Sequence, residues 1–274
     1  MTIRLPQALS QKLAVMAAAT HVLVCSDYDG TLAPIAPRPE QARLLPAAFS
    51  ILHALAALPD TRVAIISGRT RQDLGAHSGL GQPVVLIGSH GAEGAGQPTD
   101  TTAVRWAELA ALEHAVAGLC AQVSGAWVEV KSFGIAVHVR QADPADAAWV
   151  LANVRAAQAL WPGLQVTEGK AVIEFSVLRI GKDQAVRWLS ADWGTQPQVL
   201  YLGDDVTDEA AFAEMGPRDV GIKVGAGPTT AAFRVASERD ALRVMTFLWS
   251  RRAAASGGLT GQKRPEISKV TAEC

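Results

Sequence analysis

The sequence predicts an α/β protein with a Rossmann-like, doubly wound parallel sheet and an inserted α+β domain. Three short β-rich runs cover residues 22–25, 62–66 and 199–202, and polar residues follow each of them. Such runs are typical of strands that a parallel sheet buries on both faces. Ligands bind at the carboxyl ends of these strands, near a switch in strand order. The polar residues after the three runs can therefore meet in one crevice.

Strand-like and helix-like stretches alternate along the first part of the chain. A proline-rich loop at residues 34–39 leads into a helix-like stretch at residues 46–58. After the second run, the pattern Thr70-x-x-Asp73 predicts a capped helix. A further β-rich run covers residues 84–87. This alternation suits a parallel sheet, because parallel strands need long crossover connections.

The pattern changes between residues 91 and 181. A helix-like stretch around residues 104–123 precedes two β-like runs, and another around residues 144–160 precedes two more. The order helix, hairpin, helix, hairpin indicates an α+β insert. Such an insert can act as a lid that excludes solvent from the crevice and contacts the leaving group. The loop after the first run is too short to form a lid domain.

We expect the insert to divide the chain into two domains and a tail. The core would consist of residues 1–95 and 178–252, and the cap of residues 96–177. Residues 253–274 are rich in small and charged side chains and predict a flexible tail. A chain of 274 residues, 49% of them hydrophobic, can fill the interiors of both domains.

Charge and cysteine content exclude several classes of protein. The formal net charge of −1 gives no field for nucleic acid or an anionic membrane, so any phosphate site must be local. The three cysteines, Cys25, Cys120 and Cys274, include no pair at metal-ligand spacing. No apolar run reaches about 18 residues, the length of a membrane span. We therefore expect a cytoplasmic protein without nucleic-acid or membrane partners.

Two carboxylates follow the first run. Asp27 and Asp29 are two residues apart and can point to the same side of the chain. The first can attack phosphorus, and the second can protonate the leaving alcohol and later activate water. The alternative is a Ca²⁺-binding loop of the EF-hand type, which would need Glu where Arg38 stands and a helix upstream. The sequence favours phosphoryl transfer.

A second acidic group lies in residues 203–209, after the third run. A carboxylate that attacks a phosphate dianion needs a cation between the two. The oxygen ligands that we expect for Mg²⁺ are the Asp27 carboxylate, the Asp29 carbonyl, the Asp204 carboxylate and Asp208, directly or through water. Asp205 competes with Asp208 for this role. The alternative is an acidic helix N-terminus capped by Thr207 or Asp205, and both descriptions can hold at once.

Four segments resemble the signatures of the haloacid dehalogenase-like phosphohydrolases: residues 27–32, Ser67, Lys182 and residues 203–209. Residues 27–35, 88–93 and 131–140, with residues 203–209, narrow the resemblance to the trehalose-6-phosphate phosphatases. This resemblance implies a core with a cap of the second type (C2). It also implies Mg²⁺-dependent hydrolysis of trehalose 6-phosphate through an aspartyl phosphate, as the last step of trehalose biosynthesis. We expect a monomer, functionally paired with a trehalose-6-phosphate synthase.

The phosphate needs donors and positive charge. Ser67 should donate a hydrogen bond to a phosphoryl oxygen, and Gly30 and Thr31 can offer backbone N–H groups beside it. The resemblance gives Lys182 the task of neutralising the transferring phosphoryl group. Arg69 fits either a phosphate ligand or a charge on a helix surface.

Two strands of the predicted cap alternate between apolar and polar side chains. One face holds Ile135, Val137, Val139, Ile173 and Phe175. The other face holds Ala136, His138, Arg140, Glu174 and Ser176. We expect the apolar face to pack on the cap helices. The polar face is either an ordinary solvated sheet surface or a ligand-binding one.

The resemblance assigns the polar face to the sugar. Lys131, His138 and Arg140 match a cap motif that faces the sugar, Glu174 matches a cap carboxylate and Glu93 matches an acid of the hinge. Paired donors and acceptors are needed there, because a desolvated hydroxyl without a partner costs about 1–3 kcal/mol.

Two departures from the family pattern leave the sugar open. Val139 stands where an aromatic residue is common, and Ser176-Val177 stands where a basic residue and a proline often follow the glutamate. Another sugar phosphate, such as sucrose 6-phosphate, mannosylphosphoglycerate or a hexose phosphate, is therefore an alternative substrate. A non-catalytic sugar-phosphate sensor is the remaining alternative.

Overall fold

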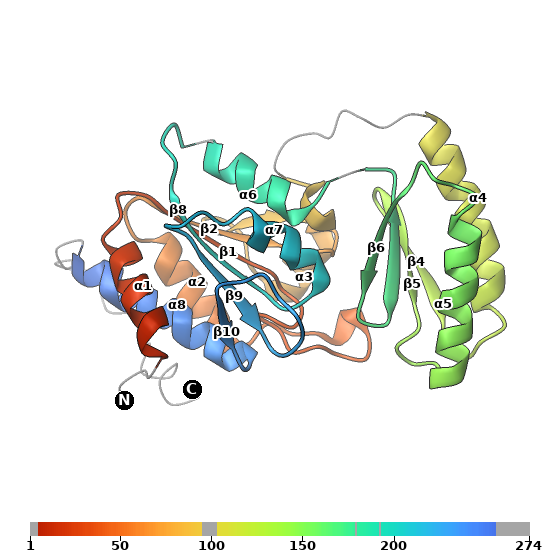
Figure 1. Ribbon diagram of the computed structural model, residues 1–274, viewed down its shortest axis with the longest axis horizontal. Helices are drawn as coiled ribbons and strands as arrows, with labels where there is room; N and C mark the ends of the chain where they lie inside the picture. The colour runs from red at the N-terminus through yellow and green to blue at the C-terminus, as the bar shows by residue number, and fades with distance from the viewer. Residues whose placement is uncertain (1–4, 95–102, 179, 192, 256–274) are drawn as a thin grey trace.

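The computed structural model describes residues 5–94, 103–178, 180–191 and 193–255, and it has two parts, each built on one sheet (Figure 1). The first is a parallel sheet with the strand order β10-β9-β8-β1-β2-β3. Its strands are β1 (Val22–Ser26), β2 (Thr61–Ile66), β3 (Val85–Ile87), β8 (Gln198–Gly203), β9 (Val220–Val224) and β10 (Phe233–Val235). The three β-rich runs after which polar residues were noted form the adjacent strands β8, β1 and β2. The predicted fold class is confirmed.

Helices cover both faces of the parallel sheet. One face carries α1 (Gln7–Ala17), α2 (Pro46–Ala56) and α8 (Glu238–Ala255), and α6 (Lys182–Ala191) and α7 (Glu209–Ala213) lie on the other. Helix α3 (Arg71–Ser78) and the short 3₁₀ helices η1 (Pro39–Gln41), η2 (Ser89–Gly91) and η3 (Val206–Asp208) lie in the connections. Helix α2 ends two residues before the predicted end, and Thr70 caps α3 by accepting the Asp73 N–H at 3.1 Å.

Strand β1 occupies the centre of this sheet and is fully buried. Val22 and Val24 point into the cluster beneath α1, α2 and α8, while Leu23 and Cys25 point into the cluster beneath α6 and α7. A strand that is buried on both faces needs a continuous apolar run, which is why no alternation is visible in the sequence. Because β2 and β8 flank β1 on opposite sides, the strand order switches here.

The second part is an antiparallel sheet with the order β4-β5-β7-β6, covered on one face by two helices. Its elements are α4 (Ala103–Cys120), β4 (Trp127–Lys131), β5 (Gly134–His138), α5 (Pro144–Gln158), β6 (Gln165–Gly169) and β7 (Val172–Ser176). The predicted apolar face is buried in one cluster with side chains of α4 and α5. We call this part the cap and the first part the core.

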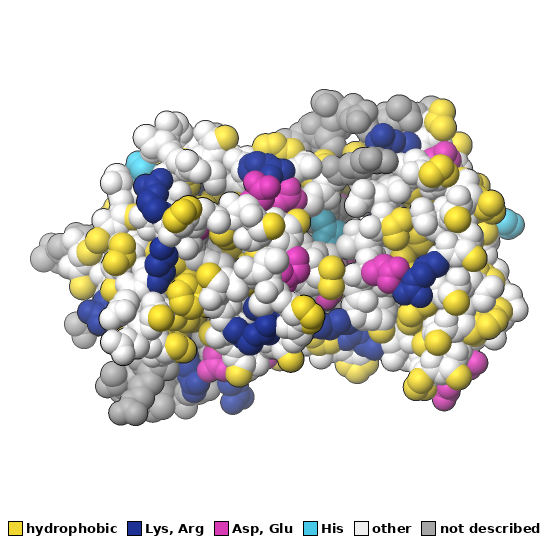
Figure 2. Space-filling model, in the orientation of Figure 1, with side chains coloured by type: hydrophobic (Ala, Val, Ile, Leu, Met, Phe, Trp, Pro, Cys, Tyr) yellow, Lys and Arg dark blue, Asp and Glu magenta, His cyan; other side chains and the backbone are white. Residues whose placement is uncertain are grey.

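The order helix, hairpin, helix, hairpin is thus confirmed, whereas the exact domain boundaries stay a prediction. Helix α8 continues to Ala255, and the rest of the predicted tail, residues 256–274, lies outside the described residues. No helix among the described residues is both long and apolar enough to cross a membrane. Acidic and basic side chains lie along the boundary between core and cap (Figure 2).

Candidate active site

A cavity of about 160 Å³ lies between the carboxyl edge of the parallel sheet and the polar face of the cap. Ten of the predicted site residues line this cavity: Asp27, Asp29, Ser67, Arg69, Lys131, His138, Arg140, Glu174, Lys182 and Asp204. The core contributes the ends of β1, β2 and β8, and the cap contributes β4, β5 and β7. Gly30, Thr31, Glu93 and Asp208 are not among its lining residues.

Asp27 is held at the end of β1 and faces Lys182. Its N–H donates to the Leu202 carbonyl on β8 at 2.9 Å, and its side chain is buried. The Lys182 ammonium lies 2.7 Å from Asp27 Oδ1 and 2.8 Å from Asp208 Oδ1. Burial raises the pKa of Asp27 well above its usual value, Lys182 opposes this shift, and the acids Asp208 and Asp204 add to it. Lys182 therefore bridges two buried carboxylates, Asp27 and Asp208.

Asp208 is a structural anchor as well as a member of this acidic group. Its Oδ1 accepts hydrogen bonds from Lys182 and from the Tyr201 hydroxyl at 2.8 Å, and its Oδ2 accepts the N–H groups of Asp204 and Asp205. The carboxylate of Asp205 caps η3 by accepting the Val206 N–H at 2.9 Å. The expected acidic helix start and the expected acidic cluster thus coexist.

The donor set suits a divalent cation. Asp27, Asp204 and Asp208 each offer a carboxylate oxygen, and these atoms lie within 4.8 Å of one another. All three residues are buried, and hard oxygen ligands of this kind are what Mg²⁺ and similar ions prefer. Burial also raises the pKa of Asp204, although Lys170 lowers it. An added cation would favour the ionised form of Asp27, which burial and the neighbouring carboxylates of Asp208 and Asp204 disfavour.

Gly30 shapes the loop after β1, and the donation of its N–H to phosphate stays a prediction. Its φ of +80° favours glycine, and a Cβ at this position would collide with the Asp204 carboxylate. Its N–H donates to the Ala33 carbonyl at 2.7 Å, and the Thr31 N–H is directed to the Tyr28 carbonyl at 3.4 Å. Both amides are therefore used within the loop, and glycine is needed here so that Asp204 can approach.

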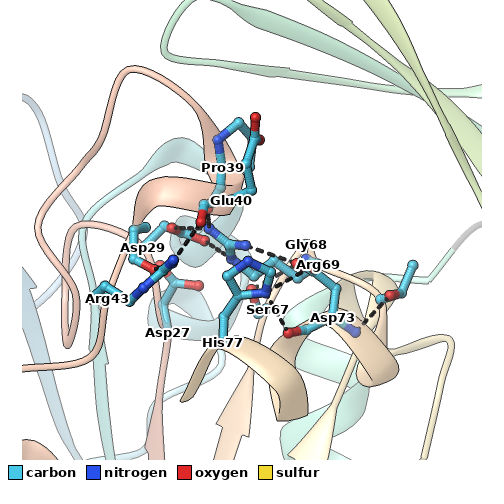
Figure 3. A network of polar contacts seen from close by, with 12 residues as sticks. Asp27, Asp29, Pro39, Glu40, Arg43, Ser67, Gly68, Arg69, Asp73 and His77 are labelled. Carbon is cyan, nitrogen blue, oxygen red and sulfur yellow. Dashed lines mark hydrogen bonds and ion pairs between the residues drawn. The ribbon is translucent and has the colours of Figure 1, made fainter. Parts of the chain in front are cut away.

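Arg69 binds the second carboxylate of the motif rather than standing free (Figure 3). Its Nε lies 2.7 Å from Asp29 Oδ2 and its Nη2 lies 2.8 Å from Asp29 Oδ1, which makes a bidentate pair. Nη1 donates to Asp73 Oδ2 at 2.8 Å, and Nη2 also donates to the Pro39 carbonyl of η1. Asp73 in turn lies 2.9 Å from His77 Nδ1. Arg69, which is only 6% exposed, therefore joins Asp29 to helices α3 and η1.

Ser67 lies beside this network at the end of β2. It is 1% exposed and lines the cavity, and its Oγ accepts the Arg69 N–H at 3.2 Å. Its own N–H donates to the Ile87 carbonyl at 3.0 Å. The hydroxyl hydrogen can therefore be directed at a ligand, and its donation to a phosphoryl oxygen stays a prediction.

Lys131 and Glu174 form an ion pair of the cap that also contacts the core. Lys131 Nζ lies 2.7 Å from Glu174 Oε1 and 3.1 Å from the Gly68 carbonyl, and Glu174 Oε2 lies 2.8 Å from His90 Nε2. Burial alone would raise the pKa of Glu174, but Lys131 and His90 together lower it below the usual value. Both predicted cap residues thus lie in the cavity and join the cap to the core.

His138 and Arg140 lie on the same cap face. His138 Nε2 is 2.7 Å from Glu129 Oε2, and its ring stacks on Trp127 with centroids 4.7 Å apart. The Arg38 guanidinium of the core lies 5.9 Å from the centroid of the same Trp127 ring. Arg140 Nη2 donates to the Lys170 carbonyl at 2.9 Å.

Glu93 stabilises a loop and does not line the cavity. Its Oε2 accepts the Arg71 N–H at 2.6 Å, and its Oε1 accepts the Ser89 hydroxyl at 2.8 Å. This carboxylate connects the segment after β3 to the start of α3. Both of its oxygens serve the hinge here, and its contact with the sugar stays a prediction.

Several cavity residues were not predicted: His90, Trp127, Glu129 and Lys170. Glu129 and Trp127 precede Lys131 by two and four positions on β4, so a period of 2 counted back from Lys131 would have found them. His90 and Lys170 belong to a 3₁₀ turn and a hairpin tip. Neither position has a periodic signal, and only the folded chain places them at the cavity.

Known proteins resemble this chain in sequence and in fold. The trehalose-phosphatase family model matches residues 25–239. A bifunctional trehalose-6-phosphate synthase/phosphatase of Thermoproteus tenax is 36% identical over 236 residues, which cover 81% of this chain and 31% of that protein. The trehalose-6-phosphate phosphatase of Escherichia coli is 33% identical over 222 residues, 78% of this chain and 81% of that protein. A Mycobacterium tuberculosis trehalose-phosphate phosphatase is 37% identical over 235 residues, 81% of this chain and 58% of its own length.

This chain therefore spans less than two thirds of the Thermoproteus and mycobacterial proteins but most of the E. coli one. Among solved structures, the C-terminal domain of C. albicans trehalose-6-phosphate phosphatase shares the fold with a TM-score of 0.76 at 22% identity, over 89% of this chain and 96% of that one. A sucrose-phosphatase from Synechocystis reaches a TM-score of 0.51 at 17% identity, over 85% and 98%. Because the family model covers most of the chain, this protein belongs to the trehalose-phosphatase family of the haloacid dehalogenase-like hydrolases.

Proposed function

We propose that this protein hydrolyses trehalose 6-phosphate to trehalose and inorganic phosphate. The single observation that carries the proposal is the position of Asp27 and Asp29. Both line one cavity whose other wall is a polar cap surface with donors and acceptors suited to a sugar. The family membership and the names of the relatives support trehalose 6-phosphate as the substrate.

In the proposed reaction, Asp27 attacks phosphorus and the bond from phosphorus to the sugar oxygen breaks. Asp29 gives its proton to that oxygen, so the sugar leaves as an alcohol. Asp29 then takes a proton from water, which attacks the aspartyl phosphate and releases phosphate and free Asp27. Lys182, 2.7 Å from Asp27 Oδ1, and the hydroxyl of Ser67 would stabilise the charge on the transferring group.

Mg²⁺ is the proposed cofactor. Asp27, Asp204 and the Asp29 carbonyl would hold it, with Asp208 acting directly or through water, and the ion would supply positive charge between the nucleophile and the phosphate. Asp208 already accepts four hydrogen bonds, and this favours the contact through water. Gly30 leaves the space for the Asp204 carboxylate.

The cap would recognise the disaccharide through Lys131, Glu174, His138 and Arg140. In the structure these side chains satisfy one another or their neighbours, for example in the Lys131–Glu174 pair at 2.7 Å. Sugar hydroxyls would replace some of these contacts, since a hydroxyl can both donate and accept. Trp127 is covered by His138, so a stacking role for this ring is less favoured than hydrogen bonding.

Phosphate release from four substrates tests this function: trehalose 6-phosphate, sucrose 6-phosphate, glucose 6-phosphate and p-nitrophenyl phosphate, each with Mg²⁺ or with chelator. We expect selective, Mg²⁺-dependent release from trehalose 6-phosphate. His138→Ala, Arg140→Ala and Glu174→Ala should reduce this activity far more than the activity on p-nitrophenyl phosphate. Preference for another sugar phosphate would overturn the assignment of the cap, and no release from any substrate would favour a sensor.

Two further properties belong to this proposal. The Thermoproteus relative supports a functional pairing with a synthase, because its name gives both a synthase and a phosphatase activity. A cytoplasmic location is supported by Cys25 and Cys120, which are buried free thiols.

A further inference from the structure

A cap residue with no role in the proposed reaction contacts the acidic cluster. Lys170 lies at the tip of the hairpin between β6 and β7. Its Nζ lies 2.7 Å from Asp204 Oδ2 and also donates to the Asp204 carbonyl at 3.2 Å. The Lys170 side chain is 55% exposed, whereas that of Asp204 is 6% exposed. A largely exposed cation of the cap thus pairs with a carboxylate that belongs to the proposed metal site.

The backbone around Lys170 lies close to the loop after β8, which contains Asp204 and Asp205. A Cβ on Gly169 would lie 3.1 Å from Asp205 Oδ2, so the tip approaches this loop closely. Arg140 Nη2 holds the Lys170 carbonyl at 2.9 Å, and Ala171 adopts a φ of +61°. The tip is therefore supported by the cap itself, while the exposed ammonium is the part that can leave.

Two lysines pair with the three carboxylates, while the buried Lys223 donates to the Asp204 carbonyl at 2.6 Å. Lys182 binds Asp27 and Asp208, and Lys170 binds Asp204. A divalent cation at the proposed site would bind the same carboxylate that pairs with Lys170, and Mg²⁺ demands near-octahedral ligands around it. Two positive charges within a few ångströms of each other also repel strongly where water is partly excluded. Lys170 and the metal ion cannot both keep their best contacts with Asp204.

We propose that Lys170 and a divalent cation compete for the Asp204 carboxylate, so that metal binding releases the tip of the β6–β7 hairpin from the core. Because such coupling is reciprocal, a hairpin seated on Asp204 weakens metal binding. This inference rests on the proposed metal site but not on the identity of the sugar. It gives the cap a second function, which is to sense whether the metal is bound.

The test measures Mn²⁺ binding to the full chain without substrate, by the loss of the free-ion EPR signal. Lys170→Met should bind Mn²⁺ about two- to fivefold more tightly than wild type, as expected for the loss of a partly exposed ion pair. Lys12→Met is the matched control, because it removes the same charge from α1, away from the cavity, and should bind like wild type. Equal or weaker binding by Lys170→Met would overturn the proposal.

Hydrogen exchange supplies a second readout that does not depend on activity. Mn²⁺ should speed amide exchange at residues 169–172 in the wild type and leave it unchanged in Lys170→Met. If exchange at the tip slows equally in both proteins, the metal closes the hairpin and the inference is wrong. If neither wild type nor Asp204→Asn binds Mn²⁺, the metal site itself fails, and phosphate release from trehalose 6-phosphate then decides separately about the proposed activity.

Discussion

Replacing Arg69 by methionine should damage catalysis through Asp29. The substitution removes the bidentate pair at 2.7 and 2.8 Å and the contact with Asp73. Losing one partner of a buried pair costs about 3–5 kcal/mol, but Asp29 is 33% and Asp73 38% exposed, so water would recover part of this. We expect a loss of about 2–3 kcal/mol in the free energy of unfolding, or roughly 4–6 °C in Tm for a chain of 274 residues.

The catalytic loss should depend on the leaving group. General acid–base catalysis contributes about 10²–10⁴-fold, and a misplaced Asp29 should forfeit part of it, about 10- to 100-fold in the first-turnover rate with trehalose 6-phosphate. p-Nitrophenyl phosphate should lose much less in that step, because its leaving group needs no proton. Rapid-quench measurements of both substrates, below the Tm of the variant, give the comparison.

The matched control is Arg71→Met, an exposed arginine two residues away on α3. Its rates and stability should stay close to wild type. A higher KM with unchanged kcat in Arg69→Met would show that Arg69 stabilises the bound substrate and the transition state equally, as a phosphate ligand would. This result would refute a role through Asp29. An equal loss on both substrates would also refute a role through Asp29.

Three other substitutions probe the site and the cap. Gly30→Ala should abolish tight Mn²⁺ binding, because its Cβ would collide with the Asp204 carboxylate; calorimetry that shows wild-type affinity would contradict this. Burial raises the pKa of Glu174, but Lys131 and His90 lower it by more than that. The ionised carboxylate therefore stabilises the fold above about pH 4.3, and this stabilisation is lost as the pH falls further. Urea unfolding should therefore show a smaller acid-dependent loss in Glu174→Gln than in wild type, and identical pH profiles would count against the ion pair. Phe175→Ala should cost about 3–5 kcal/mol, since this side chain is 1% exposed in the cap core, and a loss below about 1 kcal/mol would argue against that packing.

The core of the site could be predicted because each residue follows a strand whose apolar run is visible in the sequence. β1 and β8 end directly before Asp27 and Asp204, and β2 ends before Ser67. Parallel strands end at one edge of a sheet, so three sequence-distant groups converge without any knowledge of side-chain contacts. Lys182 opens α6, and a resemblance was needed to separate it from a surface lysine.

The contacts between core and cap could not be predicted in the same way. His90 has a φ of +55° in a 3₁₀ turn, and Lys170 lies on a hairpin tip, so neither obeys a helix or strand period. The motif assigns Glu93 to the sugar, and only the structure shows that its carboxylate also accepts the Arg71 N–H and the Ser89 hydroxyl. Local patterns fix which face a side chain takes, whereas partners across two domains depend on how the domains meet.

The most direct test of phosphoryl transfer by Asp27 is to trap the phosphoryl enzyme. Enzyme and trehalose 6-phosphate labelled in the phosphoryl group would be mixed with Mg²⁺, quenched in acid within the first turnover, and mapped by peptide mass analysis. We predict label on Asp27, with neither label nor turnover in Asp27→Asn. Undiminished turnover by Asp27→Asn, or label on another residue, would contradict the proposed mechanism.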